Sequence, residues 1–252
     1  MLTVKDLKVK IGNTEVLRGV NFMIEPGESV GIIGPNGSGK TTLFNCLSGF
    51  LRASSGSIEY LSQDISTLAP YQRARLGLGR VFQNFGIFRE MTVLENMLIA
   101  LEADLPWWKG LLPTGSKRGP LYDQACKMLA SVGLDGKLDS SASELSGGQA
   151  RLLEIIRLIA FKSELFLLDE PTAGVSPIMK GEIANLIRDL SRQDKTVLVI
   201  EHDLNFIQSF CEKIIVLDMG RVVLEGSAAE VRANPMLQRI YFGTEGSDSS
   251  EE

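Results

Sequence analysis

The sequence contains few of the residues that build metal clusters or disulfide frameworks. It has one histidine, His202, and three cysteines, Cys46, Cys126 and Cys211, in 252 residues. The cysteines are odd in number, lie far apart and show none of the spacings that are typical of metal ligands. This pattern argues against a disulfide-stapled secreted domain and favours reduced thiols in a cytosolic protein. We therefore expect the cysteines to be small residues of the core.

The sequence also lacks a basic surplus and any long apolar run. Lysine and arginine number 26 against 31 acidic residues, which gives a formal net charge of -5 and a pI near 5.2. Binding to a phosphate backbone normally requires a basic face, so nucleic acid is excluded as the main partner. Charges interrupt every stretch of the roughly 18 residues that a membrane span requires, and Met1 to Asp6 does not resemble a signal peptide. Any work at a membrane must go through a partner or the protein surface.

The most informative stretch is rich in glycine and lies between a short apolar run, Val30 to Ile33, and a predicted helix, Thr41 to Ser48. Strand, loop and helix in this order are the context in which G-x-x-x-x-G-K-[ST] binds phosphate. Backbone N–H groups and the helix N-terminus would face the phosphate oxygens. We expect Lys40 to reach the β- and γ-phosphates and the Thr41 hydroxyl to bind Mg²⁺. The alternative is a glycine-rich turn that only caps a helix. The predicted loop comprises Gly34, Pro35, Asn36, Gly37, Ser38, Gly39, Lys40, Thr41 and Thr42.

Hydrophobic patterning predicts strands on both sides of this loop. Apolar and charged residues alternate from Leu2 to Ile11, as in a half-buried strand, and a second strand is expected from Glu15 to Ile24. Leu165 to Leu168 and Thr196 to Ile200 are continuous apolar runs that end at acidic residues. Such runs are typical of parallel strands buried on both faces. The chain is therefore predicted to have an α/β fold.

The stretch from 84 to 150 has no strand pattern and shows helix signals, including the capping box Thr92 to Glu95. We expect it to be a helical subdomain inserted into an α/β core that comprises 1–83 and 151–242. The last stretch, 243–252, is small, polar and acidic, so it is predicted to be disordered.

A second motif, Leu145-Ser146-Gly147-Gly148-Gln149, follows Lys40 by about a hundred residues and precedes a predicted helix. Ser146 can cap that helix, and Gly147 and Gly148 leave its N–H groups open to an anion. Alone, S-G-G-Q could be only a cap. Combined with the phosphate loop and the strand ending in Asp169-Glu170, it resembles the signature motif of the ATP-binding subunits of ABC transporters. The resemblance extends over about Leu2 to Gly243.

This resemblance implies a RecA-like P-loop NTPase core with an antiparallel β subdomain, and an ATPase that uses ATP and Mg²⁺. Asp169 would hold Mg²⁺ through water, and Glu170 would act as general base on the attacking water. Gln83 matches a glutamine that touches Mg²⁺ or water and senses the membrane partner. His202 matches the histidine that contacts the γ-phosphate. The alternatives are a surface acid pair for Glu170 and ordinary surface residues for Gln83 and His202.

The resemblance also implies partners. In the family the signature motif, here Leu145, Ser146, Gly147, Gly148 and Gln149, closes over ATP held by a second cassette. We therefore expect a head-to-tail homo- or heterodimer with two ATP molecules between the subunits. It would associate with integral membrane permease subunits and a solute-binding protein, at the cytoplasmic face of the membrane.

The chain departs from the family pattern at two positions. An aromatic residue usually stacks on adenine where Ile11 stands here, so Ile11 and Val16 are expected to form an apolar wall instead. Base–aromatic stacking is worth about 1–3 kcal/mol per base in nucleic-acid binders, and its loss would weaken ATP affinity. Ser176 occupies a position after Asp169 at which many members carry Asp, so communication between the two ATP sites is expected to differ.

Several segments resemble the ATPase subunits of branched-chain amino-acid importers, a group that also includes urea and amide importers. The segments are Phe82-Gln83-Asn84, Phe88 to Asn96, the insert with Trp107 and Trp108, Ala173 to Pro177, and Ile240 to Gly243. Asn84 to Met91 would line the groove that receives a helix of the membrane subunit, and the two tryptophans would contact either a partner or their own helices. The alternatives are a lipopolysaccharide-exporter ATPase, a non-transport ABC protein, and a plain P-loop kinase or GTPase. A non-transport ABC protein would usually carry two cassettes in one chain or a long coiled coil, and neither is present in this sequence. A plain P-loop kinase or GTPase would lack Ser146 to Gln149 and the His202 switch.

Overall fold

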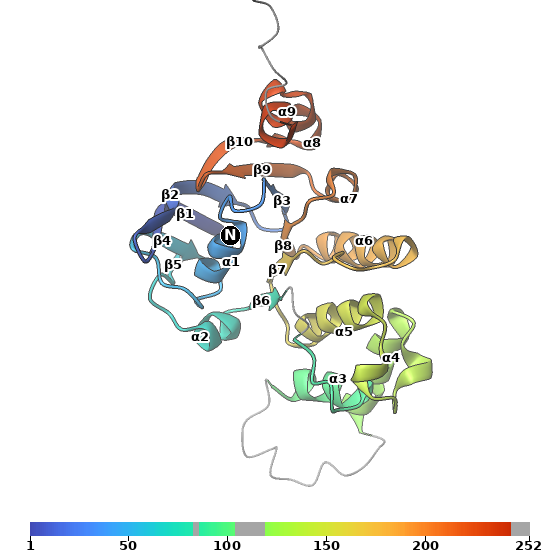
Figure 1. Cartoon of the computed structure of the whole chain (residues 1–252). Helices are drawn as coiled ribbons and strands as arrows, with labels where there is room; N and C mark the ends of the chain where they lie inside the picture. Colours follow the sequence, from blue (N-terminus) through green and yellow to red (C-terminus); the bar gives the residue numbers. More distant parts are fainter. Residues whose placement is uncertain (83–85, 104–118, 243–252) are drawn as a thin grey trace, which may run out of the picture.

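Two β-sheets form the frame of the computed structural model, which describes residues 1–82, 86–103 and 119–242 (Figure 1). One sheet has four strands in the order β2-β1-β4-β5, and the other has six in the order β10-β9-β3-β8-β7-β6. Gln83, Trp107, Trp108 and the predicted disordered stretch 243–252 lie outside the described residues.

The four-stranded sheet is antiparallel. Its strands are β1 (Leu2–Ile11), β2 (Thr14–Ile24), β4 (Ser55–Tyr60) and β5 (Gln63–Asp64). Alternate apolar residues of β1 are buried in a core that also contains apolar residues of α1 (Lys40–Leu47) and of the second sheet. The expected antiparallel β subdomain is therefore present, and the short strand β5 adds an edge that the sequence pattern did not indicate.

The six-stranded sheet is parallel apart from its last strand, β10, which runs antiparallel to β9. All residues of β3, β7 and β8 are buried, which explains their unbroken apolar sequences. The strands are β3 (Ser29–Ile33), β6 (Leu78–Val81), β7 (Leu165–Asp169), β8 (Thr196–Ile200), β9 (Lys213–Asp218) and β10 (Arg221–Ser227).

Helices pack around this sheet. In α6 (Pro177–Arg192), Ile183, Ile187 and Leu190 face the core, and Ser176 caps the helix by accepting a hydrogen bond from the N–H of Met179. The remaining helices of this part are α2 (Pro70–Arg75), α7 (Leu204–Gln208), α8 (Ala228–Ala233) and α9 (Pro235–Phe242). No helix in the described part of the chain combines the length and apolarity needed to span a bilayer.

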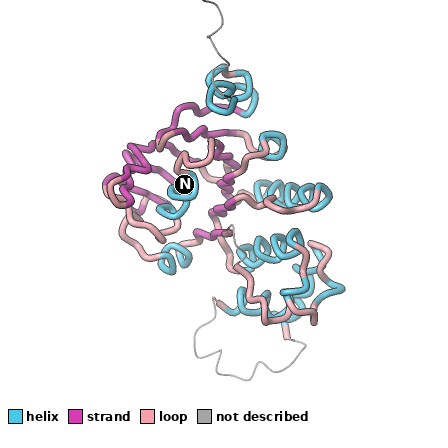
Figure 2. The backbone as a smooth tube through the Cα atoms, in the orientation of Figure 1, coloured by secondary structure: helices cyan, strands magenta, loops and turns pink. Residues whose placement is uncertain are grey.

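Three further helices, α3 (Val93–Glu102), α4 (Pro120–Ser131) and α5 (Gly147–Ala160), share a separate apolar core. They lie together at the lower right of Figure 2. Leu153 and Ile156 of α5 belong to this core, whereas Leu152 and Ile155 of the same helix join the core of the six-stranded sheet. Because α5 is continuous, the predicted boundary at residue 150 falls inside a helix. We propose that the helical unit ends at Ala160.

Candidate functional site

Four neighbouring parallel strands bring most of the predicted site residues to one edge of the six-stranded sheet. β3 leads into the glycine-rich loop, β8 into His202, β7 ends at Asp169, and β6 leads to Phe82. The carboxyl ends of parallel strands meet at the same edge, where open α/β sheets bind ligands. Gln83 follows Phe82 in the chain but lies outside the described residues.

The loop after β3 is shaped to hold an anion. Lys40 donates hydrogen bonds from Nζ to the carbonyl oxygens of Gly34 (2.8 Å) and Pro35 (2.9 Å), which ties its ammonium to the loop. A Cβ at Gly34 would lie 2.0 Å from the carbonyl oxygen of Leu217, so the close approach of loop and sheet requires glycine. The helix α1 starts with Gly39 at its N-cap and no side-chain cap, which leaves N–H groups available to a ligand.

This loop lines a cavity of about 220 Å³. Ile11, whose side chain was expected to flank the base, is not among the lining residues and is 53% exposed, whereas Val16 lines the cavity. None of the five signature residues from Leu145 to Gln149 lines it. The residues that line it are Val16, Asn36, Gly37, Gly39, Lys40, Thr41, Thr42 and Glu170.

The charges beside the cavity suit a triphosphate with Mg²⁺. Burial lowers the pKa of the Lys40 ammonium, and the carboxylates of Glu170 and Asp169 oppose this shift. Burial raises the pKa of the Asp169 carboxyl, which the Arg80 guanidinium opposes. Among the described residues no group of three or more His, Cys, Asp or Glu side chains is placed to hold a metal unaided. Mg²⁺ normally takes one or two protein oxygens together with phosphate and water, so Thr41 and Asp169 fit this ion.

Glu170 and His202 form a pair at the cavity. Nε2 of His202 lies 2.6 Å from Oε1 of Glu170, and the two side chains are 42% and 22% exposed. Glu170 has a φ of 47°, a left-handed conformation that is uncommon for a residue with a side chain. Its N–H donates to the carbonyl oxygen of Ile200, so the turn after β7 is tied to β8. A partly exposed carboxylate in this position can accept a proton from water.

Glu201 is a residue of the site that sequence reasoning missed. Its buried carboxylate accepts hydrogen bonds from the N–H (2.9 Å) and the hydroxyl (2.6 Å) of Thr172 and from the N–H of His202 (3.1 Å). Glu201 therefore joins the segment after Glu170 to the segment that carries His202. The only signal in the sequence was an acidic residue directly after a buried strand.

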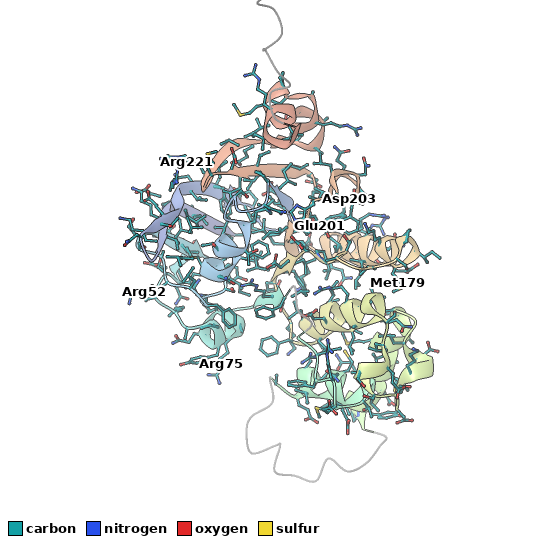
Figure 3. All side chains as sticks on the ribbon, viewed as in Figure 1. Arg52, Arg75, Met179, Glu201, Asp203 and Arg221 are labelled. Atoms are coloured by element: carbon teal, nitrogen blue, oxygen red, sulfur yellow. The ribbon has the colours of Figure 1, made fainter. Side chains whose placement is uncertain are left out.

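The signature motif begins α5. The Ser146 hydroxyl accepts a hydrogen bond from the N–H of Gln149, and the Gln149 side chain accepts one from the N–H of Ser146. Figure 3 labels Met179 on α6, and a Cβ at Gly148 would lie 2.7 Å from the Cβ and Cγ of Met179. A residue larger than glycine would push α5 away from α6. Gly148 therefore sets how close these two helices lie.

Farther along α5, three charged side chains hold the backbone of Phe82 and Gly86. Glu154 accepts hydrogen bonds from the N–H groups of Phe82 (3.3 Å) and Gly86 (2.9 Å). Arg151 donates to the carbonyl oxygen of Phe82 (2.6 Å) and to Glu154 (2.7 Å), and Arg157 donates to that of Gly86 (2.6 Å). Spacing by three residues places the three side chains on one side of the helix. We call this set the α5 clamp. Sequence reasoning did not identify it.

A larger groove of about 410 Å³ lies between α2 and β6 on one side and α3 and α5 on the other, and its lining is mainly apolar. Phe50, Tyr71 and Phe88 line it and are 58%, 63% and 46% exposed. Gly86 and Phe88, from the predicted groove segment, also line it, while Asn84 and Phe85 lie outside the described residues.

Comparison with known proteins finds similarity along nearly the whole chain. Residues 17–173 match a family model described as ABC transporter. A high-affinity branched-chain amino acid transport ATP-binding protein of Escherichia coli K12 is 38% identical over 249 residues, 96% of this chain and 98% of that protein. A lipopolysaccharide export system ATP-binding protein of Acidithiobacillus ferridurans is 38% identical over 228 residues, 90% of each chain.

Solved structures resemble this one closely. An ATP-binding cassette of an ABC transporter in its ADP conformation has a TM-score of 0.84 at 33% identity and covers 96% of this chain and 98% of its own. A dimeric cassette in a post-hydrolysis state bound to ADP and Pi has a TM-score of 0.77 at 28% identity and covers 90% and 99%. The similarity in sequence and in structure thus spans both the sheets and the helical unit.

Proposed function

Because this chain belongs to the ABC transporter family, we propose that it drives uptake of branched-chain or other hydrophobic amino acids, or of a related small solute such as urea or an amide. The chain is an ATPase cassette. The observation that carries the proposal is the Glu170–His202 pair beside the cavity that contains Lys40. The choice of solute rests on the relatives that serve branched-chain amino-acid transport.

We propose a part in hydrolysis for each of these residues, which the geometry supports. Lys40 and the N-terminus of α1 would hold the β- and γ-phosphates, and Glu170 would take a proton from the attacking water. His202 would orient Glu170 and contact the γ-phosphate. Mg²⁺, held by Thr41 and Asp169, would neutralise charge on the phosphate oxygens. Together these groups act by positioning and by electrostatic stabilisation of the transition state.

A second cassette would complete the site. The signature residues do not line the cavity of their own chain, and a dimeric cassette is among the similar solved structures. We expect the Glu170→Gln protein to change from monomer to dimer when Mg-ATP is added, because hydrolysis no longer separates the subunits. Light scattering measures this change, and Mg-ADP is the control that should leave a monomer. A monomer with bound ATP would contradict self-pairing and point to a different partner cassette.

The groove is the surface proposed for the membrane subunits. Its exposed aromatic side chains, Phe50, Tyr71 and Phe88, form an apolar lining that a short helix of a permease subunit would bury. The cassette would then be held peripherally at the cytoplasmic face of the membrane. A solute-binding protein on the other side would deliver the solute.

The test of this function is transport by the whole complex. The full chain, with its permease subunits and any second cassette, is placed in liposomes, and ATP-dependent movement of labelled leucine, urea and lipopolysaccharide is compared. We expect uptake of leucine or urea, and a complex with Glu170→Gln should show almost none. Movement of lipopolysaccharide alone would replace the proposal with an exporter, and ATP hydrolysis without movement of any of the three would overturn the proposed solutes.

A further inference from the structure

Arg80, on β6, contacts the carboxylate proposed to bind Mg²⁺. Its Nη2 lies 3.1 Å from Oδ2 of Asp169, and the two side chains are 6% and 3% exposed. Little water reaches this ion pair, so the pair is weakly screened and its geometry is well defined. The strand order places β6 next to β7, which ends at Asp169.

The same guanidinium reaches α1, the helix that begins beside the phosphates. Its Nη1 donates to Oδ1 of Asn45 (2.8 Å) and to the hydroxyl of Ser48 (2.7 Å). Asn45 lies four residues after Thr41, about one helical turn, and on the same side of α1. Arg80 therefore joins the helix that carries one proposed Mg²⁺ ligand to the strand end that carries the other. A planar guanidinium holds such a fork of hydrogen bonds in a way that a lysine ammonium does not.

Aromatic rings of the groove contact this guanidinium. The Cζ of Arg80 lies 4.8 Å from the ring centre of Phe82 and 6.0 Å from that of Phe50. These two rings pack edge to face with centres 5.4 Å apart, and both line the groove. A helix that enters the groove would touch Phe50, which is 58% exposed, and would thereby press on the ring pair that holds Arg80.

We propose that Arg80 is a positioning residue that fixes Asp169 relative to α1 and, through Phe82 and Phe50, makes the Mg²⁺ site respond to what occupies the groove. This inference rests on the proposed ATPase site. It adds a route by which the membrane partner acts on that site, from the groove rings through one guanidinium to the Mg²⁺ ligand.

The test measures how much Mg²⁺ improves nucleotide binding. The improvement is the ratio of the dissociation constant in EDTA to the dissociation constant in Mg²⁺. The dissociation constant of a fluorescent ATP analogue is determined in EDTA and in Mg²⁺, with Glu170→Gln in every protein to prevent turnover. Arg80→Lys should leave binding in EDTA unchanged and reduce the improvement by Mg²⁺ about tenfold or more, as loss of groups that orient metal ligands does. An unchanged improvement would overturn the proposal, and so would a larger one, because Arg80 would then compete with the metal for Asp169.

One further variant keeps the test decisive. Asn45→Ala removes one of the two hydrogen bonds from Arg80 to α1, at a half-buried position, and leaves the one to Ser48. It should therefore fold and reduce the improvement by about two- to tenfold. If Arg80→Lys does not fold, Asn45→Ala decides, and an unchanged improvement in that variant overturns the proposal. A parent protein that fails to bind the analogue in either condition would instead overturn the proposed function.

A matched pair of variants tests the proposed link between Arg80 and the groove. Phe50→Ala should reduce the improvement by Mg²⁺ about two- to fivefold, because it removes a ring next to Arg80. Tyr71→Ala is the control, since Tyr71 lines the same groove and is similarly exposed but has the guanidinium of Arg75 over its ring. Equal effects of the two substitutions, or none from Phe50→Ala, would overturn the link.

Discussion

Glu170→Gln is expected to slow steady-state ATP turnover by about 10²- to 10⁴-fold, the usual contribution of a general base, while ATP binding stays largely intact. Glutamine keeps the size of the side chain and its reach to His202, which lies 2.6 Å from the carboxylate, but it does not accept a proton from water. In the proposed function the phosphates would be held by Lys40 and the N-terminus of α1, which the substitution does not touch. Phosphate release and nucleotide binding measure the two effects separately.

Glu182→Gln is the matched control for this result. Glu182 is an exposed residue of α6, so the same chemical change there should leave both turnover and binding unchanged. Normal turnover in Glu170→Gln would remove Glu170 from the role of general base. The general base would then be another side chain at the same edge of the six-stranded sheet.

Glu154→Ala is expected to lower the free energy of unfolding by about 3–5 kcal/mol, because removal of one partner from a buried ion pair leaves the other charge uncompensated. In the α5 clamp, Glu154 is 5% exposed and Arg151 is 1% exposed. The N–H groups of Phe82 and Gly86 would also lose their acceptor. Urea unfolding followed by circular dichroism measures the change.

Glu182→Ala should change the same quantity by less than about 0.5 kcal/mol, as substitutions at exposed sites usually do. A loss below about 1 kcal/mol in Glu154→Ala would mean that the clamp is not a buried, fully paired network. Such a result would also remove the reason to regard α5 as the element that holds Phe82 and Gly86 in place.

The buried strands and the phosphate loop could be predicted from the sequence because their signals are local. The unbroken apolar runs of β7 and β8 follow from burial on both faces of a parallel sheet, and the structure confirms them. The capping box at Thr92 also appears as predicted at the start of α3. The proposed roles of Glu170, His202 and the signature residues remain predictions that rest on resemblance and geometry.

Other features could not be predicted because they join residues far apart in the chain. Asp169 and Arg80 are separated by 89 positions, and Glu154 and Gly86 by 68. Neither pair leaves a periodic pattern, and a buried arginine looks like a surface arginine in a sequence. The boundary predicted at residue 150 falls inside α5, and no local pattern indicates that this helix contributes to two cores at once.

The sequence by itself determined the buried strands, the glycine-rich loop and the capped start of α3, because backbone preferences and apolar periodicity act over a few residues. The family followed from the resemblance of the combined motifs to those of ABC transporters. The tertiary structure alone decided which side chains meet: Glu170 with His202, Arg80 with Asp169 and α1, and the α5 clamp with Phe82 and Gly86. These contacts depend on strand order and on the packing of α5 between two cores. Burial then makes the contacts of Arg80 and of the α5 clamp energetically important, because a charge removed from water must find its partner within the protein.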